Sequence, residues 1–146
     1  MRNYQIYLIH DEFARHYMGR EKMFFGLFMD YKHSSGELTE IIERQIDYVT
    51  KPIPVLSLRH RLEQEFMKNK HFHLDNGVYY VQKIKGNGRA RIDIQPKSIS
   101  LTIEGQYDAE AIFFECFRKC ESFLLAIDLE HGRYGWLKPI KERKFV

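Results

Sequence analysis

Two closely spaced histidines and a glycine pair are the residues of this chain whose types suit metal or phosphate chemistry. His71 and His73 would share one face of a strand at the spacing of metal ligands, but two ligands are too few, and the sequence sets no third beside them. Gly86-Asn-Gly88 lacks the further glycines and the lysine of a phosphate loop, and Asn-Gly between strand-like segments favours a hairpin turn. We therefore predict solvated histidines, a turn, and no metal or cofactor.

The sequence also contains no motif that indicates covalent or acid–base catalysis. The serines at positions 34, 35, 57, 98, 100 and 122 have no G-x-S-x-G context. Cys116 and Cys120 lie four residues apart in an apolar helical pattern, which favours reduced core thiols over a disulfide. Among 20 Asp and Glu residues no carboxylate pair stands out as one with a raised pKa. The sequence therefore predicts a protein that is not an enzyme.

The C-terminal residues 133–146 alternate basic and aromatic side chains, which suits nucleic-acid binding because bases stack on rings while cations meet phosphates. The side chains concerned are Arg133, Tyr134, Trp136, Lys138, Lys141, Arg143, Lys144 and Phe145. The alternative, which we favour, is a C-terminal strand and tail that pack down, with rings closing the core and charges facing water. A net charge of +3 does not decide between them, since a protein partner with an acidic rim would be served equally well.

Composition fits a single domain over residues 1–146. With 44% hydrophobic and 14% aromatic residues, the chain has enough apolar material for a sizeable core. No run approaches the roughly 18 apolar residues of a membrane span, and the N-terminus lacks the apolar segment of a signal peptide. We therefore expect a cytoplasmic protein.

An aromatic pair dominates the first predicted helix. A strand-like run from Tyr4 passes into a helix that acidic residues open and that ends near Gly19. On this helix Phe13 and Tyr17 are four residues apart and share one face. Such a pair is either a piece of the core or the centre of a docking surface.

A helix over about residues 35–50 contains two residues that break its pattern. Ser34-Ser-Gly-Glu37 has the form of a capping box, and an apolar stripe follows at helical spacing. The stripe comprises Leu38, Ile41, Ile42, Ile46 and Val49. Gln45 falls within the stripe and Tyr48 at its edge, so this flank holds either a buried amide and a core-edge tyrosine or a surface that faces a partner.

The remaining pattern predicts an α+β fold of two or three layers. Further helical periodicity covers residues 23–29, 55–66 and 109–120, and the segments 78–81, 90–94 and 99–103 are expected to form an antiparallel meander. Residues 123–127 form a continuous apolar run, typical of a strand covered on both faces. We expect a central mixed, largely antiparallel sheet packed by four to five helices.

Four motifs along the chain resemble the SirA family, the sporulation inhibitors of replication. They are Tyr-Leu-Ile-x-x-Glu-Phe-Ala-x-His-Tyr-x-Gly-Arg-Glu at 7–21, Gln-Ile-x-Tyr-x-Thr-x-Pro-Ile-Pro at 45–54, Ala-Glu-x-Ile-Phe-Phe-Glu at 109–115, and the ending Arg-Tyr-Gly-Trp-Leu-x-Pro-x-Lys-Glu-Arg-x-Phe-Val. Between about residues 57 and 105 only the general layout is similar.

The resemblance implies a non-enzymatic regulator of endospore-forming bacteria that binds the N-terminal domain (domain I) of the initiator DnaA. We expect such a protein to act as a monomer that forms a 1:1 complex with DnaA. By occluding a surface of DnaA, it would block new rounds of initiation. The family's contact positions correspond here to Phe13, Tyr17, Gln45 and Tyr48. Mixed polar and aromatic side chains are typical of interface centres, and the tyrosine at 17 combines contact area with a hydroxyl that needs a partner or water. For Phe13, core and interface remain equal alternatives.

Overall fold

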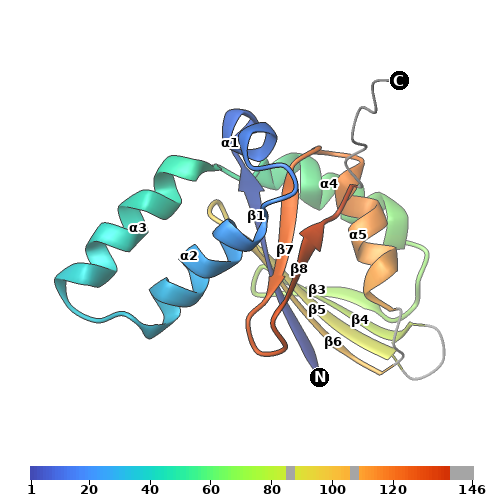
Figure 1. Cartoon of the computed structure of the whole chain (residues 1–146). Helices are drawn as coiled ribbons and strands as arrows, with labels where there is room; N and C mark the ends of the chain where they lie inside the picture. The colour runs from blue at the N-terminus through green and yellow to red at the C-terminus, as the bar shows by residue number, and fades with distance from the viewer. Residues whose placement is uncertain (85–87, 106–108, 139–146) are drawn as a thin grey trace.

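The computed structural model describes residues 1–84, 88–105 and 109–138. Of residues 83 and 84 it describes the backbone alone. Within the described ranges the chain forms five helices and one eight-stranded sheet (Figure 1). Seven strands follow the order β3-β4-β5-β6-β1-β7-β8, and the eighth, β2, pairs with β1. The elements are β1 Arg2–Ile9, α1 Asp11–His16, α2 Lys22–His33, α3 Glu37–Val49, β2 Thr50–Lys51, α4 Val55–Phe66, β3 Phe72–Asp75, β4 Val78–Ile84, β5 Gly88–Ile94, β6 Ile99–Glu104, α5 Glu110–Arg118, β7 Leu124–Asp128 and β8 Arg133–Trp136. Every described strand pair is antiparallel, so the predicted α+β class is confirmed.

Strand β1 lies inside the sheet and separates two hydrophobic clusters. Its alternate residues Tyr4, Ile6 and Leu8 join the larger cluster, which includes buried side chains of α4 and α5. From its other face, Ile9 is buried with Ala14 of α1 and with side chains of α2, including Phe28. Figure 1 shows the consequence: α4 and α5 lie over one face of the sheet, whereas α2 and α3 project from its other side as an antiparallel helical hairpin.

The predicted strands are confirmed, and one further hairpin was missed. Strands β4, β5 and β6 form the meander, and β7 is buried along its whole length. Strand β3 pairs with β4 through a turn at Asn76 and Gly77, whose φ angles of 50° and 80° are the positive pair that a tight hairpin turn requires. The predicted turn at 86–88 falls on residues 86 and 87, which lie outside the described residues, although Ile84 and Gly88 are paired. The tail beyond residue 138 also lies outside them.

The predicted capping box at Ser34 is wrong. Gly36, with φ 64°, precedes α3 and makes no side-chain capping bond. Because the chain turns at this glycine, Ser34 belongs to the end of α2, where its hydroxyl donates to the carbonyl of Tyr31 at 2.8 Å and contacts the Thr39 hydroxyl at 2.8 Å.

The apolar stripe of α3 is only partly in the core. Ile42 is buried, and Ile46 and Val49 are half-buried, but Leu38 and Ile41 are 56% and 51% exposed. The first turns of α3 extend beyond the sheet, and α2 lies alongside them (Figure 1). Helical spacing identified the apolar face correctly, but at Leu38 and Ile41 no element among the described residues covers it.

Candidate functional site

A hollow of about 520 Å³ lies between the first three helices, and we call it the α1–α3 groove. Its lining is mostly apolar: Tyr17, Met23, Phe24, Leu27, Arg44, Gln45, Tyr48 and Val49. Three of the four residues predicted at the site therefore line one groove, although the whole of α2 separates Tyr17 from Gln45 and Tyr48 in sequence. The fourth, Phe13, meets the Tyr48 ring edge-on with centroids 5.2 Å apart.

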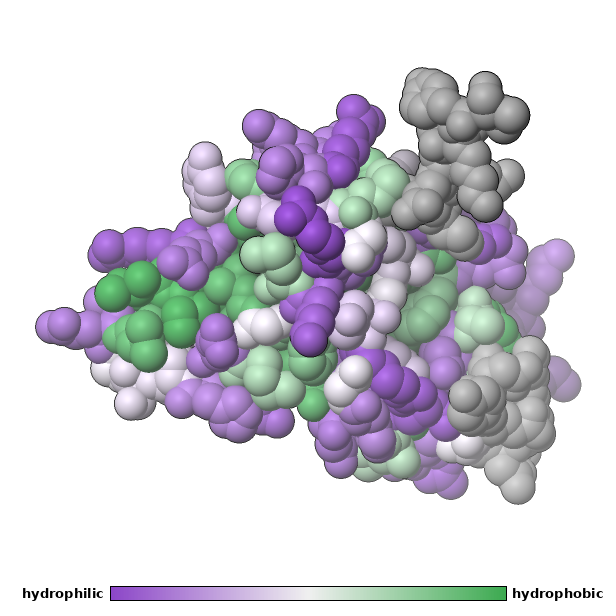
Figure 2. Space-filling model, in the orientation of Figure 1, coloured by the Kyte–Doolittle hydropathy of each residue, from purple (hydrophilic) through white to green (hydrophobic). Residues whose placement is uncertain are grey.

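The unusual flank of α3 is exposed. Tyr48 is 73% exposed, and Gln45 is also exposed. Of the two sequence interpretations, the buried amide is therefore wrong, and this flank faces outward. Leu38 and Ile41 continue the same stripe at helical spacing, so the apolar surface runs along the helix. Figure 2 shows hydrophobic residues gathered over α2 and α3.

Tyr17 immediately follows the last residue of α1, and its amide donates to the Phe13 carbonyl at 3.0 Å. Its half-buried ring lies edge-on to Phe24, with centroids 5.6 Å apart, and the Arg20 guanidinium lies 5.3 Å from its centre. Tyr17 thus presents one side to the core and another to the groove, which fits an aromatic anchor with a fixed orientation.

Phe13 also contacts both the core and the exposed side of the groove. Its half-buried ring packs against the buried cluster of α1 and α2, and it supports the exposed Tyr48 ring from α1. The contact joins α1 to α3 across the edge of the groove. Core and surface roles, which the sequence left as alternatives, are combined at this residue.

Glu21 holds the connection between α1 and α2, and sequence reasoning missed it. Its carboxylate accepts hydrogen bonds from the Gly19 amide at 2.9 Å and from the Trp136 indole at 3.0 Å. Burial acts to raise the pKa of Glu21, but hydrogen bonds from the Trp136 indole and from the backbone of Gly19 and of Glu21 itself outweigh it and hold the pKa below its ordinary value. Trp136 in turn lies edge-on to Phe24 beneath the groove. Residues 21 and 136 are far apart in sequence, so no local pattern pointed to this contact.

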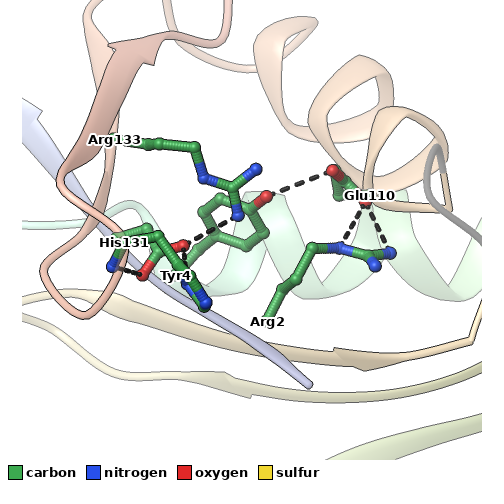
Figure 3. A network of polar contacts seen from close by, with 6 residues as sticks. Arg2, Tyr4, Glu110, His131 and Arg133 are labelled. Carbon is green, nitrogen blue, oxygen red and sulfur yellow. Dashed lines mark hydrogen bonds and ion pairs between the residues drawn. The ribbon is translucent and has the colours of Figure 1, made fainter.

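A network of polar contacts, with the buried Asp128 at its centre and the exposed Arg133 and His131 around it, lies at the other end of the sheet beside α5 (Figure 3). The Asp128 carboxylate is fully buried and accepts from Arg133 at 2.9 Å, while the His131 ring nitrogen lies 2.9 Å away. The Tyr4 hydroxyl donates to Glu110 at 3.1 Å, and burial, reinforced by this carboxylate, raises the pKa of Tyr4 to about 12. Arg2 pairs with the same carboxylate of Glu110 at 3.0 Å.

This network has the character of a structural brace. Burial acts to raise the pKa of Asp128, but its bonds with Arg133 and His131 keep the pKa below the ordinary value, so the carboxylate stays ionised at neutral pH. Arg133 is therefore paired within the protein, and Trp136 is half-buried, as expected of a C-terminal strand that packs down, whereas Tyr134 of the same strand is 41% exposed. Lys141, Arg143, Lys144 and Phe145, on which the nucleic-acid alternative also depends, lie outside the described residues.

The cysteines and histidines that could have served as nucleophiles or metal ligands lie outside the α1–α3 groove. Cys116 and Cys120 are free, and burial raises the pKa of Cys116 to about 12, which makes its thiol a poor nucleophile at neutral pH. His71 and His73 are exposed, and the His73 ring stacks on Tyr80. In the described ranges no group of three or more His, Cys, Asp or Glu side chains could hold a metal ion. None of the described helices is long and apolar enough to cross a membrane.

Comparison with known proteins agrees with the motifs. The family model described as "Sporulation inhibitor of replication protein SirA" matches residues 2–141. The chain belongs to the SirA family. A SirA relative from Bacillus subtilis (strain 168), also named sporulation inhibitor of replication protein, is 44% identical over 147 aligned residues, covering 99% of each chain. The SirA match spans every element of the α1–α3 groove, and the resemblance proposed from the four motifs is confirmed.

Proposed function

We propose that this protein inhibits the initiation of DNA replication in sporulating cells by binding domain I of DnaA through the α1–α3 groove. It acts without catalysis, in the cytoplasm, as a monomer in a 1:1 complex. The observation that carries the proposal is the meeting of Tyr17, Gln45 and Tyr48 around one open apolar groove in a chain of the SirA family.

The groove has the properties of a protein-binding surface. Rigid aromatic side chains supply large contact areas at low entropic cost, and interface energy concentrates in a few such anchors. Tyr48 projects outward beside Gln45, whose amide can both donate and accept hydrogen bonds. A complex of standard size would centre on two to four anchors, each worth about 2 kcal/mol or more on truncation.

Positive charge borders the groove. Arg44 lines it, and the Arg20 guanidinium lies over the Tyr17 ring. Both are exposed, so they suit a partner whose contact surface has an acidic rim. Such charges at a rim chiefly accelerate association, whereas the apolar centre supplies affinity.

Occlusion explains how binding would stop replication. The anchors lie on helices braced by Glu21, Trp136 and the cluster beneath them, so the surface is formed before the partner arrives. A domain bound in this way covers a surface of the initiator that other partners or other initiator copies need.

Calorimetric titration of the full chain with isolated DnaA domain I tests the proposal. We expect saturable binding with one domain I per chain. Absence of binding at high micromolar concentrations of both folded proteins would refute it.

A further inference from the structure

The sheet has a second surface that the α1–α3 groove does not use. Strand β5 alternates strictly: Ala90, Ile92 and Ile94 are buried in the cluster with α4 and α5, so Arg89 and Arg91 point to the opposite face. Among the described elements, Figure 1 shows no helix over that face of β4, β5 and β6. We call this surface the open sheet face.

A row of side chains crosses the open sheet face. His73, Tyr80, Arg91, Thr102 and Asn3 are successive cross-strand partners on β3, β4, β5, β6 and β1. With neighbouring strands about 4.8 Å apart, the row spans roughly 19 Å. The rings of His73 and Tyr80 stack with centroids 5.2 Å apart and planes 15° apart, which orients an aromatic platform along the row.

A hollow of about 360 Å³ lies on this face beside the row. Its polar lining includes Tyr80, Arg89, Arg91 and Glu104. Glu104 is the cross-strand partner of Arg89, yet no ion pair joins them, and within the described residues neither arginine makes a hydrogen bond or ion pair. Opposite charges placed directly across two strands stabilise a sheet when they pair. In the part of the chain that the structure describes, these two cations therefore stand unpaired next to a stacked ring pair.

We propose that the open sheet face binds single-stranded DNA. A base stacks on Tyr80 beside His73, and the phosphates on either side meet Arg89 and Arg91. Antiparallel sheets with exposed rings bind single strands in this way, because every base has a face that can stack, while cations follow the backbone. The choice of DNA follows from membership of a family named for inhibition of replication, a process that exposes single DNA strands.

Glu104 is expected to weaken DNA binding at this site, so replacing it tests the proposal. It is the acidic member of the hollow's lining, so it repels a phosphate that approaches Arg89. Glu104→Gln is therefore expected to strengthen binding. Loss-of-binding variants alone can be confused with unfolding, whereas a gain is not open to that explanation.

Fluorescence anisotropy of a labelled oligothymidylate of about 12 nucleotides, titrated with the full chain at low salt, measures the binding. We expect Tyr80→Ala to weaken binding about fivefold or more, and Tyr80→Phe to retain it because the ring remains. Arg91→Gln should lower the slope of log K against log salt by about 0.7. Tyr48→Ala in the α1–α3 groove should leave DNA binding unchanged, which separates this proposal from the DnaA proposal.

Three results would overturn the proposal: no binding of the folded chain at low salt, full retention of binding in folded Tyr80→Ala and Arg91→Gln variants, or tighter binding of duplex DNA or oligouridylate. Loss of binding on neutralising Lys141, Arg143 and Lys144, with Arg91→Gln unaffected, would assign the site to the C-terminal segment instead.

Discussion

Replacing Tyr48 with alanine should separate binding from folding. The side chain is 73% exposed, and its ring contact within the described residues is the edge-on one with Phe13. Exposed substitutions change the free energy of unfolding by about 0.5 kcal/mol, and an aromatic pair adds about 0.5–1.5 kcal/mol. We therefore expect Tyr48→Ala to fold normally, with a loss of unfolding free energy below about 2 kcal/mol.

Tyr48→Ala should weaken the complex with DnaA domain I more than it destabilises the fold. An aromatic anchor at the centre of an interface is worth about 2 kcal/mol or more on truncation, which corresponds to a rise in Kd of about 30-fold. Tyr48→Phe removes the hydroxyl alone and should retain most of this affinity, because the ring and its contact with Phe13 remain.

Calorimetric titration with domain I gives the change in Kd, and thermal melting gives the change in stability. Leu56→Ala is the matched control, since Leu56 is 84% exposed on α4 and does not line the groove. It should leave Kd unchanged. A Tyr48→Ala variant that binds as tightly as Leu56→Ala, or one that unfolds, would refute the assignment of this ring to the interface.

Three further variants test other parts of the structure. Tyr17→Ala should weaken the complex tenfold or more in the same titration while the protein stays folded; unfolding at 25 °C would show that this ring is core. Phe113→Ala, at a fully buried position, should lower the free energy of unfolding by about 3–5 kcal/mol in a denaturant titration, and a loss below 1 kcal/mol would contradict its place in the core. Because the pKa of Asp128 is lowered on folding, its ionised form stabilises the protein above the ordinary value of 3.8, and this contribution is lost as pH falls through the lower folded pKa. The stability gap between wild type and Asp128→Asn should therefore narrow from pH 7 to pH 3 in urea unfolding, and a constant gap would be inconsistent with that linkage.

The local patterns of the sequence predicted most elements because each element's period is set by its own backbone. The alternation at Ala90, Ile92 and Ile94 gave the meander, and the continuous run before Asp128 gave the buried strand. Strand β3 was missed because its turn signal, Asn76-Gly77, joins a strand with exposed residues and little apolar alternation.

Position in space was less predictable than element type. Leu38 and Ile41 have the spacing of core residues, but whether a face is covered depends on where the helix projects, which the spacing does not contain. The contact of Glu21 with Trp136 and the cross-strand row on the open sheet face depend on strand order and register, and both join residues distant in sequence.

The candidate site was partly visible because it breaks a pattern. Gln45 and Tyr48 did not fit a core stripe, and the structure exposes both on one flank. Phe13 fitted a core stripe and a surface equally well, and its half-buried ring at the edge of the groove accounts for that ambiguity. The sequence did not predict that α2 would supply Met23 and Leu27 to the same groove.

Site-specific photo-crosslinking tests the central claim most directly, because it reports the partner and the contact together. A photoreactive phenylalanine analogue, p-benzoylphenylalanine, replaces Tyr48 in one variant and Leu56 in another, and each is irradiated with purified DnaA. We predict that position 48 crosslinks to DnaA within domain I and that position 56 does not. A crosslink from position 56 alone, or none from either position in folded protein, would contradict the proposal that the α1–α3 groove binds the initiator.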